Sequence, residues 1–402
     1  MKKILALILT LLISVSLISC GVQQREEGVF LIWYYGLDNE MAEVQGFADK
    51  WAEDKGIKVK VVSANEGTAK ELLDTAQQNR PDIYMGMRSE DTERLQMGKA
   101  VEAVPSGLIS RDEYVSDDLY KATTFKNVQY GIPMTHETVA LYYNKDMVDK
   151  VPETMEELLD MARNDGKKIS FAATDYFFSF GFVFAFGGYT FKEDENGNFD
   201  ANDFGVNNEG ALKGYKYIQD MIDHDKTFLG GASDMMTSGD FTRNITTFYI
   251  GEAGRVRTFK NSDMNFGVTK IPTADGHEVK PLKYVKMSCV SSSSTYKDLA
   301  WDFLNEFHKT SDEIYMNSNP YPPVFKKSLD SDSFKNNEHV QGLYEQSLSS
   351  TLMPNIKESG AINLVIPGYL TELCLGETTP EQCGFGIDRD FKLVIDKVLE
   401  FD

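Results

Sequence analysis

The sequence lacks the signature motifs of the common catalytic and metal-binding folds. Its 402 residues contain no HExxH, no CxxC, no Walker glycine loop and no GxSxG, and histidine occurs only five times. Zinc sites, P-loops and serine hydrolases each depend on one of these spacings. Residues 194–200 superficially resemble a calcium loop, but the glycine is misplaced and no glutamate stands at the twelfth position. We therefore expect no metal and no cofactor.

Positive charge is also scarce. Lysine and arginine number 41 against 62 aspartates and glutamates, which gives a formal net charge of −21. Without Lys2 and Lys3 the balance is 39 against 62, or −23. A chain this acidic is poorly suited to bind nucleic acid or anionic lipid headgroups. We expect neither as a partner, and we expect a soluble monomeric body.

Only one hydrophobic run is long, and it lies at the N-terminus. Lys2 and Lys3 precede an apolar stretch over residues 4–18, which has signal-peptide length and falls short of the roughly 20 residues of a membrane-spanning helix. The sequence that ends at Cys20 resembles a bacterial lipobox, which implies that Cys20 becomes the lipidated first residue. An ordinary secretion signal is the alternative. Residues 1–20 would then be the signal peptide and 21–28 a tether, with the body held outside the cytoplasm, periplasmic or on the outer face of the cell membrane.

Cysteine is rare in the rest of the chain. Cys289, Cys374 and Cys383 remain, and the last two flank eight residues. These two could form a small disulfide outside the cytoplasm, which would leave one thiol over. The sequence leaves the bridged and the free states open.

The body alternates between strand and helix patterns. Residues 30–35 and 57–63 carry the β-branched and aromatic side chains of strands, and apolar residues recur at helical spacing between them, up to Gly56. Residues 81–87 indicate a third strand. This β-α-β opening predicts parallel pairing and an α/β fold. Further on, Thr154 and Glu157 have capping-box spacing, and Pro380 stands at the first position of a last helix.

The length indicates more than one domain. About 380 mature residues suggest two domains, yet no linker or internal repeat separates them. The chain is therefore expected to cross between the lobes more than once.

Four segments, in order along the chain, resemble the extracellular solute-binding proteins of family 1, of the maltose/maltodextrin-binding kind. They are YGIPMTHETVALYYNKDMVDKVPETMEELL (130–159) and the segments 186–222, 265–281 and 352–356. The resemblance implies a type II periplasmic-binding-protein fold of two lobes, with a hinge crossed several times and ligand held between them. It implies an N-lobe of residues 29–135 and 287–333 and a C-lobe of 136–286 and 334–402. It also implies delivery of the ligand to the permease subunits of an ABC importer.

The same resemblance indicates ligand-binding positions. Glu137 stands where the family has a glutamate that accepts hydrogen bonds from sugar hydroxyls, and Asp175 where it has a second acid. Phe177 and Phe178 replace two stacking aromatics, although a core position stays open for both. The full predicted set is Tyr35, Asp38, Arg88, Ser89, Glu137, Asp175, Phe177, Phe178, Arg257 and Asn363.

Departures from the family pattern bear on the ligand. Gly86, Gly254 and Asn363 align with three tryptophans on which sugar rings stack, and that loss disfavours a long glucan chain. We expect a short or modified oligosaccharide. If one of Arg88, Arg255 or Arg257 faces the ligand, its guanidinium would suit an acidic sugar; ion pairing is the alternative.

Two further functions stay open at this point. One is a receptor for a non-sugar solute such as a peptide, a polyamine or an organic acid. The other is a secreted glycoside-cleaving enzyme that uses Glu137 and Asp175 as its carboxylate pair. The collinear resemblance favours a receptor over an enzyme.

Overall fold

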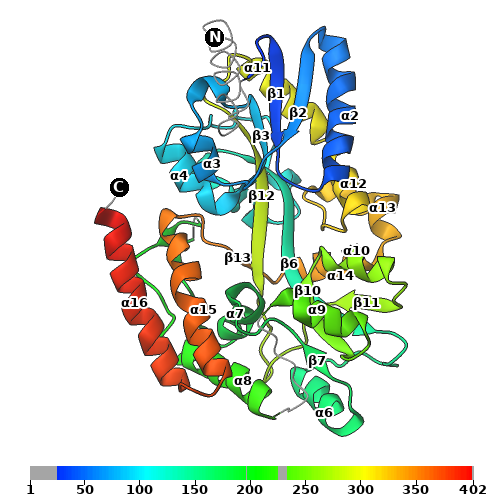
Figure 1. Cartoon of the computed structure of the whole chain (residues 1–402), viewed down its shortest axis with the longest axis vertical. Coiled ribbons are helices and arrows are strands. Elements are labelled where there is room, and N and C mark those ends of the chain that lie inside the picture. Colours follow the sequence, from blue (N-terminus) through cyan, green and yellow to red (C-terminus); the bar gives the residue numbers. More distant parts are fainter. Residues whose placement is uncertain (1–24, 196, 225–232, 401–402) are drawn as a thin grey trace, which may run out of the picture.

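The computed structural model describes residues 25–195, 197–224 and 233–400. Cys20 and residues 21–24 of the predicted tether lie outside these residues, as does Asn196. Two lobes lie one above the other, with the first strands in the upper lobe and the last helix in the lower (Figure 1). We call them the N-lobe, which contains β1 to β3, and the C-lobe, which contains β7, β10 and β11. No helix of the described residues has the length and apolar character needed to cross a membrane.

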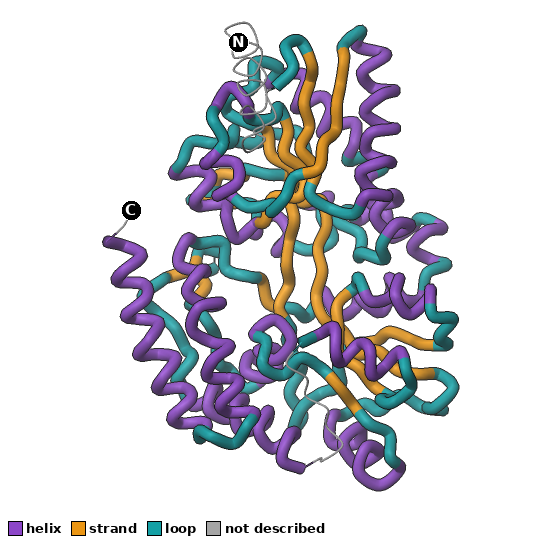
Figure 2. Tube along the Cα trace, in the orientation of Figure 1, coloured by secondary structure: helices purple, strands orange, loops and turns teal. Residues whose placement is uncertain are grey.

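The strands gather along the middle of the molecule, with helices outside them (Figure 2). The strands are β1 (Val29–Tyr34), β2 (Lys58–Ser63), β3 (Ile83–Arg88), β4 (Thr124–Phe125), β5 (Val128–Gln129), β6 (Ile132–Asn144), β7 (Ile169–Ser170), β8 (Lys192–Glu193), β9 (Phe199–Asp200), β10 (Phe248–Glu252), β11 (Phe266–Thr269), β12 (Leu282–Val290) and β13 (Thr351–Leu352). The helices are α2 (Asp38–Lys55), α3 (Ala69–Asp74), α4 (Thr92–Met97), α5 (Asp117–Ala122), α6 (Met155–Asp165), α7 (Tyr176–Ala185), α8 (Glu209–His224), α9 (Asp234–Thr242), α10 (Arg255–Asn261), α11 (Lys297–Phe307), α12 (Ser311–Ser318), α13 (Asp332–Lys335), α14 (Glu338–Ser347), α15 (Gly360–Cys374) and α16 (Pro380–Glu400).

The predicted β-α-β opening is confirmed. β1 and β2 pair in parallel, with Trp33 beside Val62, and α2 lies between them in the chain. α2 buries Val44 and Ala48 and ends at Gly56, whose φ of 66° is left-handed. Glycine adopts that conformation without a steric penalty, which is why the helix stops there.

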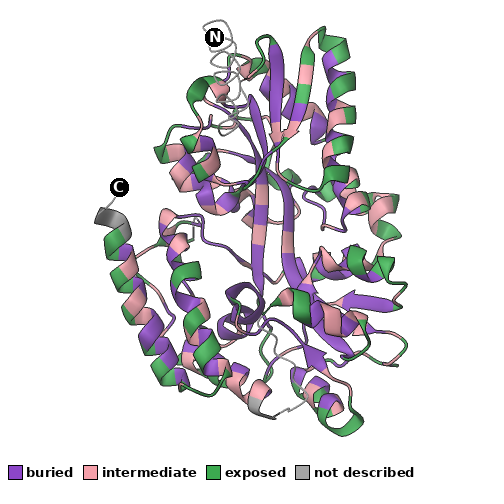
Figure 3. Ribbon diagram, in the orientation of Figure 1, coloured by how far each residue is buried: buried purple, intermediate pink, exposed green. Residues whose placement is uncertain are grey.

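One sheet runs through both lobes. Its strand order is β2-β1-β3-β12-β6-β10-β7, and β11 also pairs with β6. β6 pairs with β12 through its first half and with β10 through its second half. β12 likewise pairs with β3 in the N-lobe and with β13 near its start. Both long strands therefore belong to both lobes, and Figure 3 shows them largely buried where they cross.

A third crossing follows α12. This helix packs beside α2 in the N-lobe, whereas α14 packs on β11 and β6 in the C-lobe. The chain passes from one lobe to the other between them, through α13 (Figure 1). The several crossings expected from the missing linker are thus present.

Each lobe has its own core. The N-lobe cluster is built around β1, α2 and α11, and the C-lobe cluster around α7, α8, α15 and α16. Along β6 the change from one cluster to the other falls between Met134 and Val139. Leu352 joins the N-lobe cluster, because β13 pairs with β12 at the crossing. The exact residues at which the lobes divide stay a prediction.

Local details agree with the sequence patterns in most places. α16 begins at Pro380, as predicted. Thr154 Oγ1 accepts a hydrogen bond from the Glu157 amide at 3.1 Å, but the Glu157 carboxylate accepts from the Glu153 amide instead of closing the box on Thr154. The disulfide that the sequence left open is absent: Cys374 and Cys383 are free thiols.

Candidate functional site

Polar side chains line one face of the sheet where it passes between the lobes. The register places Arg88 beside Lys286, Tyr284 beside Glu137, and Glu252 beside Val139. Directly paired residues point to the same face, and so do residues two apart on one strand. These five polar residues therefore follow one another across four strands. We call this row, Arg88, Lys286, Tyr284, Glu137 and Glu252, the crossing patch.

Two carboxylates of the patch have no hydrogen-bond or ion-pair partner in the part of the chain that the structure describes. Glu137 and Glu252 are half-buried, and among the described residues none donates a hydrogen bond or forms an ion pair with either carboxylate. Burial raises the pKa of Glu137; Lys286 opposes the shift, and Glu40 and Asp234 add to it. Burial likewise raises the pKa of Glu252 to about 7, with the charges of Glu137 and Asp234 adding to it. Both groups are acceptors held partly away from water.

The two cations of the patch, and Arg255 beside it, each contact a group other than these two carboxylates. Lys286 Nζ lies 4.6 Å from the centroid of the Tyr35 ring. Arg88 interacts with the Tyr35 hydroxyl. Arg255 forms an ion pair with Asp234, which also accepts a hydrogen bond from a tyrosine. The ion-pairing interpretation of Arg255 is thus correct.

Aromatic rings border the patch on the C-lobe side. The Tyr284 ring lies 4.6 Å from the ring of Phe177, centroid to centroid. Phe177 and Phe178 are each only 7% exposed and belong to the C-lobe core. Asp175 caps α7, because its Oδ1 accepts from the Phe177 amide at 2.8 Å. The cap fixes the helix start and places Phe177 against the patch.

The structure gathers only part of the predicted site. Two of the predicted residues, Arg88 and Glu137, belong to the patch. Tyr35 contacts Lys286 of the patch and Phe177 contacts Tyr284 of the patch. Asp175 accepts the hydrogen bond of the Phe177 amide and so lies next to it.

The other predicted residues lie apart from the patch. Ser89 is buried directly after Arg88, and its Oγ has no partner in the described structure. Asp38, Arg257 and Asn363 are exposed, and no described hydrogen bond or ion pair joins them to the patch. Arg257 instead donates to Asn39 Oδ1 at 3.4 Å, from α10 in the C-lobe to the N-lobe.

Sequence reasoning missed several residues that lie here. Tyr284 and Lys286 alternate with buried apolar residues along β12, a period-two pattern that could have identified a patterned face. Glu252 and Asp234 carry no local signal, since only strand pairing and the folding of α9 against β10 bring them to Glu137.

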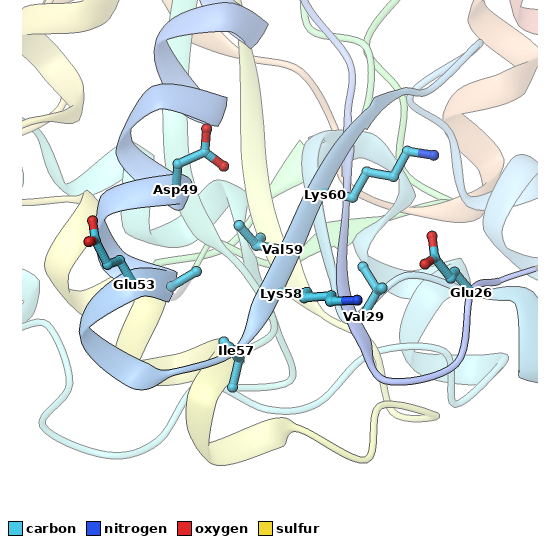
Figure 4. Close-up of a pocket in the computed structure, with 9 residues that line it drawn as sticks. Glu26, Val29, Asp49, Glu53, Ile57, Lys58, Val59 and Lys60 are labelled. Carbon is cyan, nitrogen blue, oxygen red and sulfur yellow. The ribbon is translucent and has the colours of Figure 1, made fainter.

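Other hollows of the described surface lie away from the patch. One of about 440 Å³ beside α2 is lined by side chains of both charges, among them Asp49, Glu53, Lys58 and Lys60 (Figure 4). Another of about 480 Å³ lies between the β4–β5 hairpin and the segment around Asn355. Within the part of the chain that the structure describes, no three acidic, histidine or cysteine side chains are grouped to hold a metal ion.

Comparison with known proteins gives a consistent result. Residues 46–342 match the family model described as "Bacterial extracellular solute-binding protein". The chain is 28% identical to the galactooligosaccharide-binding protein of Bacillus subtilis (strain 168), over 95% of this chain and 94% of that one. It is 25% identical to a maltooligosaccharide ABC transporter solute-binding lipoprotein of Streptococcus pneumoniae (strain ATCC BAA-255 / R6), over 90% of each chain.

Solved structures match over nearly the whole fold. A cyclo/maltodextrin-binding protein complexed with maltotetraose superposes with a TM-score of 0.83 at 22% identity, covering 93% of this chain and 98% of that one. The maltose-maltodextrin binding protein of Alicyclobacillus acidocaldarius gives 0.81 at 21% identity, covering 90% and 100%. The two-lobed periplasmic-binding-protein architecture is thereby confirmed.

Proposed function

Because the chain belongs to the bacterial extracellular solute-binding proteins, we propose that it is the lipid-anchored solute receptor of an ABC importer, and that it captures a short or modified oligosaccharide between its lobes. The named relatives bind oligosaccharides, and one of them is a lipoprotein of an ABC transporter. The lipid is carried on Cys20. Permease subunits and the membrane are the partners.

The observation that carries the proposal is the pair of unpartnered carboxylates at the crossing. A carboxylate is an acceptor only, and sugar hydroxyls are the donors that it lacks here. Burying a charge without a partner costs free energy, so Glu137 and Glu252 favour a state in which a polyol supplies hydrogen bonds. Tyr35 and Tyr284 add ring faces on which a sugar packs.

The mechanism is lobe closure about the crossing strands. A ligand that contacts both the N-lobe and C-lobe ends of the patch binds the closed arrangement better, and so shifts the population toward it. Binding without cleavage is proposed, because the relatives are transport receptors. Hydrolysis of an oligosaccharide by the purified protein would instead favour the glycosidase alternative.

A thermal-shift screen of the chain without residues 1–20 tests the proposal. The panel holds neutral oligosaccharides, monosaccharides, acidic sugars, amino acids, peptides and polyamines. A ligand at a hundred times its Kd adds about 2.7 kcal/mol, or about 3 °C for a chain of this length. Glu137→Ala should abolish the shift, while Glu53→Ala, an exposed glutamate on α2, should keep it. A shift with amino acids or peptides alone would refute the sugar assignment.

The anchor needs a separate test. Cells that express the full chain should incorporate labelled palmitate into it and retain it in the membrane fraction. Cys20→Ala should lose the label and release the protein. Label that persists in this variant would refute lipidation at Cys20.

A further inference from the structure

The charges around the crossing patch are unbalanced. Six carboxylates, Glu137 and Glu252 among them, interact electrostatically with Glu137, Glu252 or Tyr284, against three cations. The carboxylates are Glu40, Glu90, Glu137, Asp175, Asp234 and Glu252, and the cations are Arg88, Arg255 and Lys286. The deficit of positive charge is therefore local as well as global.

The three cations compensate this acidic group only in part: Lys286 opposes the pKa shift of Glu137 and Arg255 opposes that of Glu252. Arg255 is paired with Asp234, while Lys286 and Arg88 are drawn to Tyr35 at the N-lobe end. None of them forms an ion pair with Glu137 or Glu252 within the described structure. A third acid adds an independent sign of a missing partner: Glu90 Oε2 is a buried atom that accepts no hydrogen bond from the described residues. Unpaired carboxylates held away from water are costly, so the arrangement favours a partner that brings positive charge.

We propose that the sugar taken by this receptor is an amino sugar, whose ammonium group lies between Glu137 and Glu252 while its ring packs on Tyr284. The inference rests on the proposed function and adds the chemical class of the ligand. A neutral sugar would supply hydrogen bonds but leave the charge of the two acids uncompensated. An acidic sugar would add further negative charge to that of the two acids. The arginines do not indicate an acidic sugar, because Arg255 is paired with Asp234 and Arg88 interacts with Tyr35.

The geometry gives the ammonium group its place. Glu252 pairs with Val139, which is two residues from Glu137 on the neighbouring strand, so both glutamates lie on the same sheet face. The mutual repulsion of their charges contributes to the raised pKa of Glu252. An ammonium group has three donors and satisfies both carboxylates at once. Tyr284, paired directly with Glu137, offers the adjacent ring face.

The test is calorimetry of the unmodified binding protein with matched ligands. Cellobiose, its di-glucosamine analogue and the N-acetylated analogue share one backbone and differ only in the group at C2; galactose, galactosamine and N-acetylgalactosamine form a second series. We expect the free amine to bind at least tenfold more tightly than both neutral members in one series. Its affinity should fall with salt more steeply than theirs.

Variants then locate the amine. In Glu252→Gln and Glu137→Gln the ratio of amine to neutral affinity should fall at least tenfold, whereas Glu53→Gln, at the surface hollow of Figure 4, should leave the ratio unchanged. A ratio that survives both glutamine variants overturns the placement. If a neutral sugar binds as tightly as its amine, the inference fails and the proposed function stands. If no sugar binds but a polyamine does, both fail.

Discussion

Replacing Glu252 by glutamine should stabilise the unliganded protein at neutral pH and not at acidic pH. Burial raises the pKa of Glu252 from its ordinary 4.5 to about 7 in the folded state. The folded state therefore holds a proton that the unfolded state releases. The resulting stability is fully present below about pH 4.5 and is lost as the pH rises through about 7. Glutamine does not titrate, so the variant escapes this loss.

The magnitude follows from the interval between the two pKa values. From 4.5 to about 7, at 1.36 kcal/mol per pH unit, the loss is about 3 kcal/mol. Glu252 is only half-buried and solvent screens its charge, so we expect about 1.5 kcal/mol. With about 2.1 cal/mol/K of unfolding entropy per residue, this is a difference of about 2 °C in Tm.

The assay is thermal unfolding of both proteins, without ligand, at pH 4.5 and pH 7.5. The Tm difference between variant and parent should grow by about 2 °C in favour of the variant on going from the acidic to the neutral buffer. Glu53→Gln, which changes the net charge equally at an exposed site, should show no such growth. A variant that loses stability at pH 7.5 would refute the reasoning, because it would mean that the carboxylate has a partner.

Three further predictions concern stability and thiol chemistry. Asn355→Ala should lower the free energy of unfolding in urea by about 2 kcal/mol, because Asn355 Nδ2 donates to the carbonyls of Lys121, Ala122 and Thr124 at 3.2, 3.2 and 2.9 Å. The control is Asn363→Ala, at an exposed site, and equal losses in the two variants would contradict the argument. Arg25→Ala should lower the free energy of unfolding by ~2 kcal/mol, because it leaves buried Asp82 without its ion-pair partner 2.6 Å away while other donors remain. Arg163→Ala, in an exposed ion pair, should lower it by under ~0.5 kcal/mol, and equal losses in the two variants would refute the idea. Burial raises the pKa of Cys374 and that of Cys383 to about 12, so mass spectrometry should find both thiols unalkylated by iodoacetamide at pH 7.5 until urea exposes them. If only Cys289 reacts in urea, Cys374 and Cys383 form a disulfide and the prediction is wrong.

The opening of the fold is predictable because its signals are local. The apolar period of α2 and the glycine that ends it stand within twenty residues of each other, and the flanking strands read as strands by composition. The sheet that runs through both lobes has no comparable local signal in the sequence. Arg88 and Lys286 pair although they lie far apart in the sequence, and no periodicity encodes a partner at that distance. Chain length indicated two lobes, but their boundaries came only from the family resemblance.

The site divides in the same way. Glu137 and Asp175 were identified by alignment with a known pattern, whereas Glu252 ends an ordinary apolar strand and reaches Glu137 only through the register of β10 on β6. Arg255 was correctly weighed as an ion-pairing residue, but its partner, Asp234, could not be named before α9 was placed. The lipid on Cys20 stays a prediction, since it falls outside the described residues.

The strands that join the lobes also carry the crossing patch, and this gives the molecule the geometry of a lever. Points on the pivot move least when one arm swings, and points at the rim move most. Glu137 and Lys286 stand on the pivot, whereas the Arg257–Asn39 contact bridges the arms at their edge. Contacts confined to the pivot change little as the lobes move and so set how tightly a ligand first binds, whereas a ligand that reaches both the N-lobe and C-lobe ends of the patch gains contacts on closure. Contacts at the rim change most, so substitution of Arg257 or Asn39 should alter how completely the arms close and not whether the ligand enters.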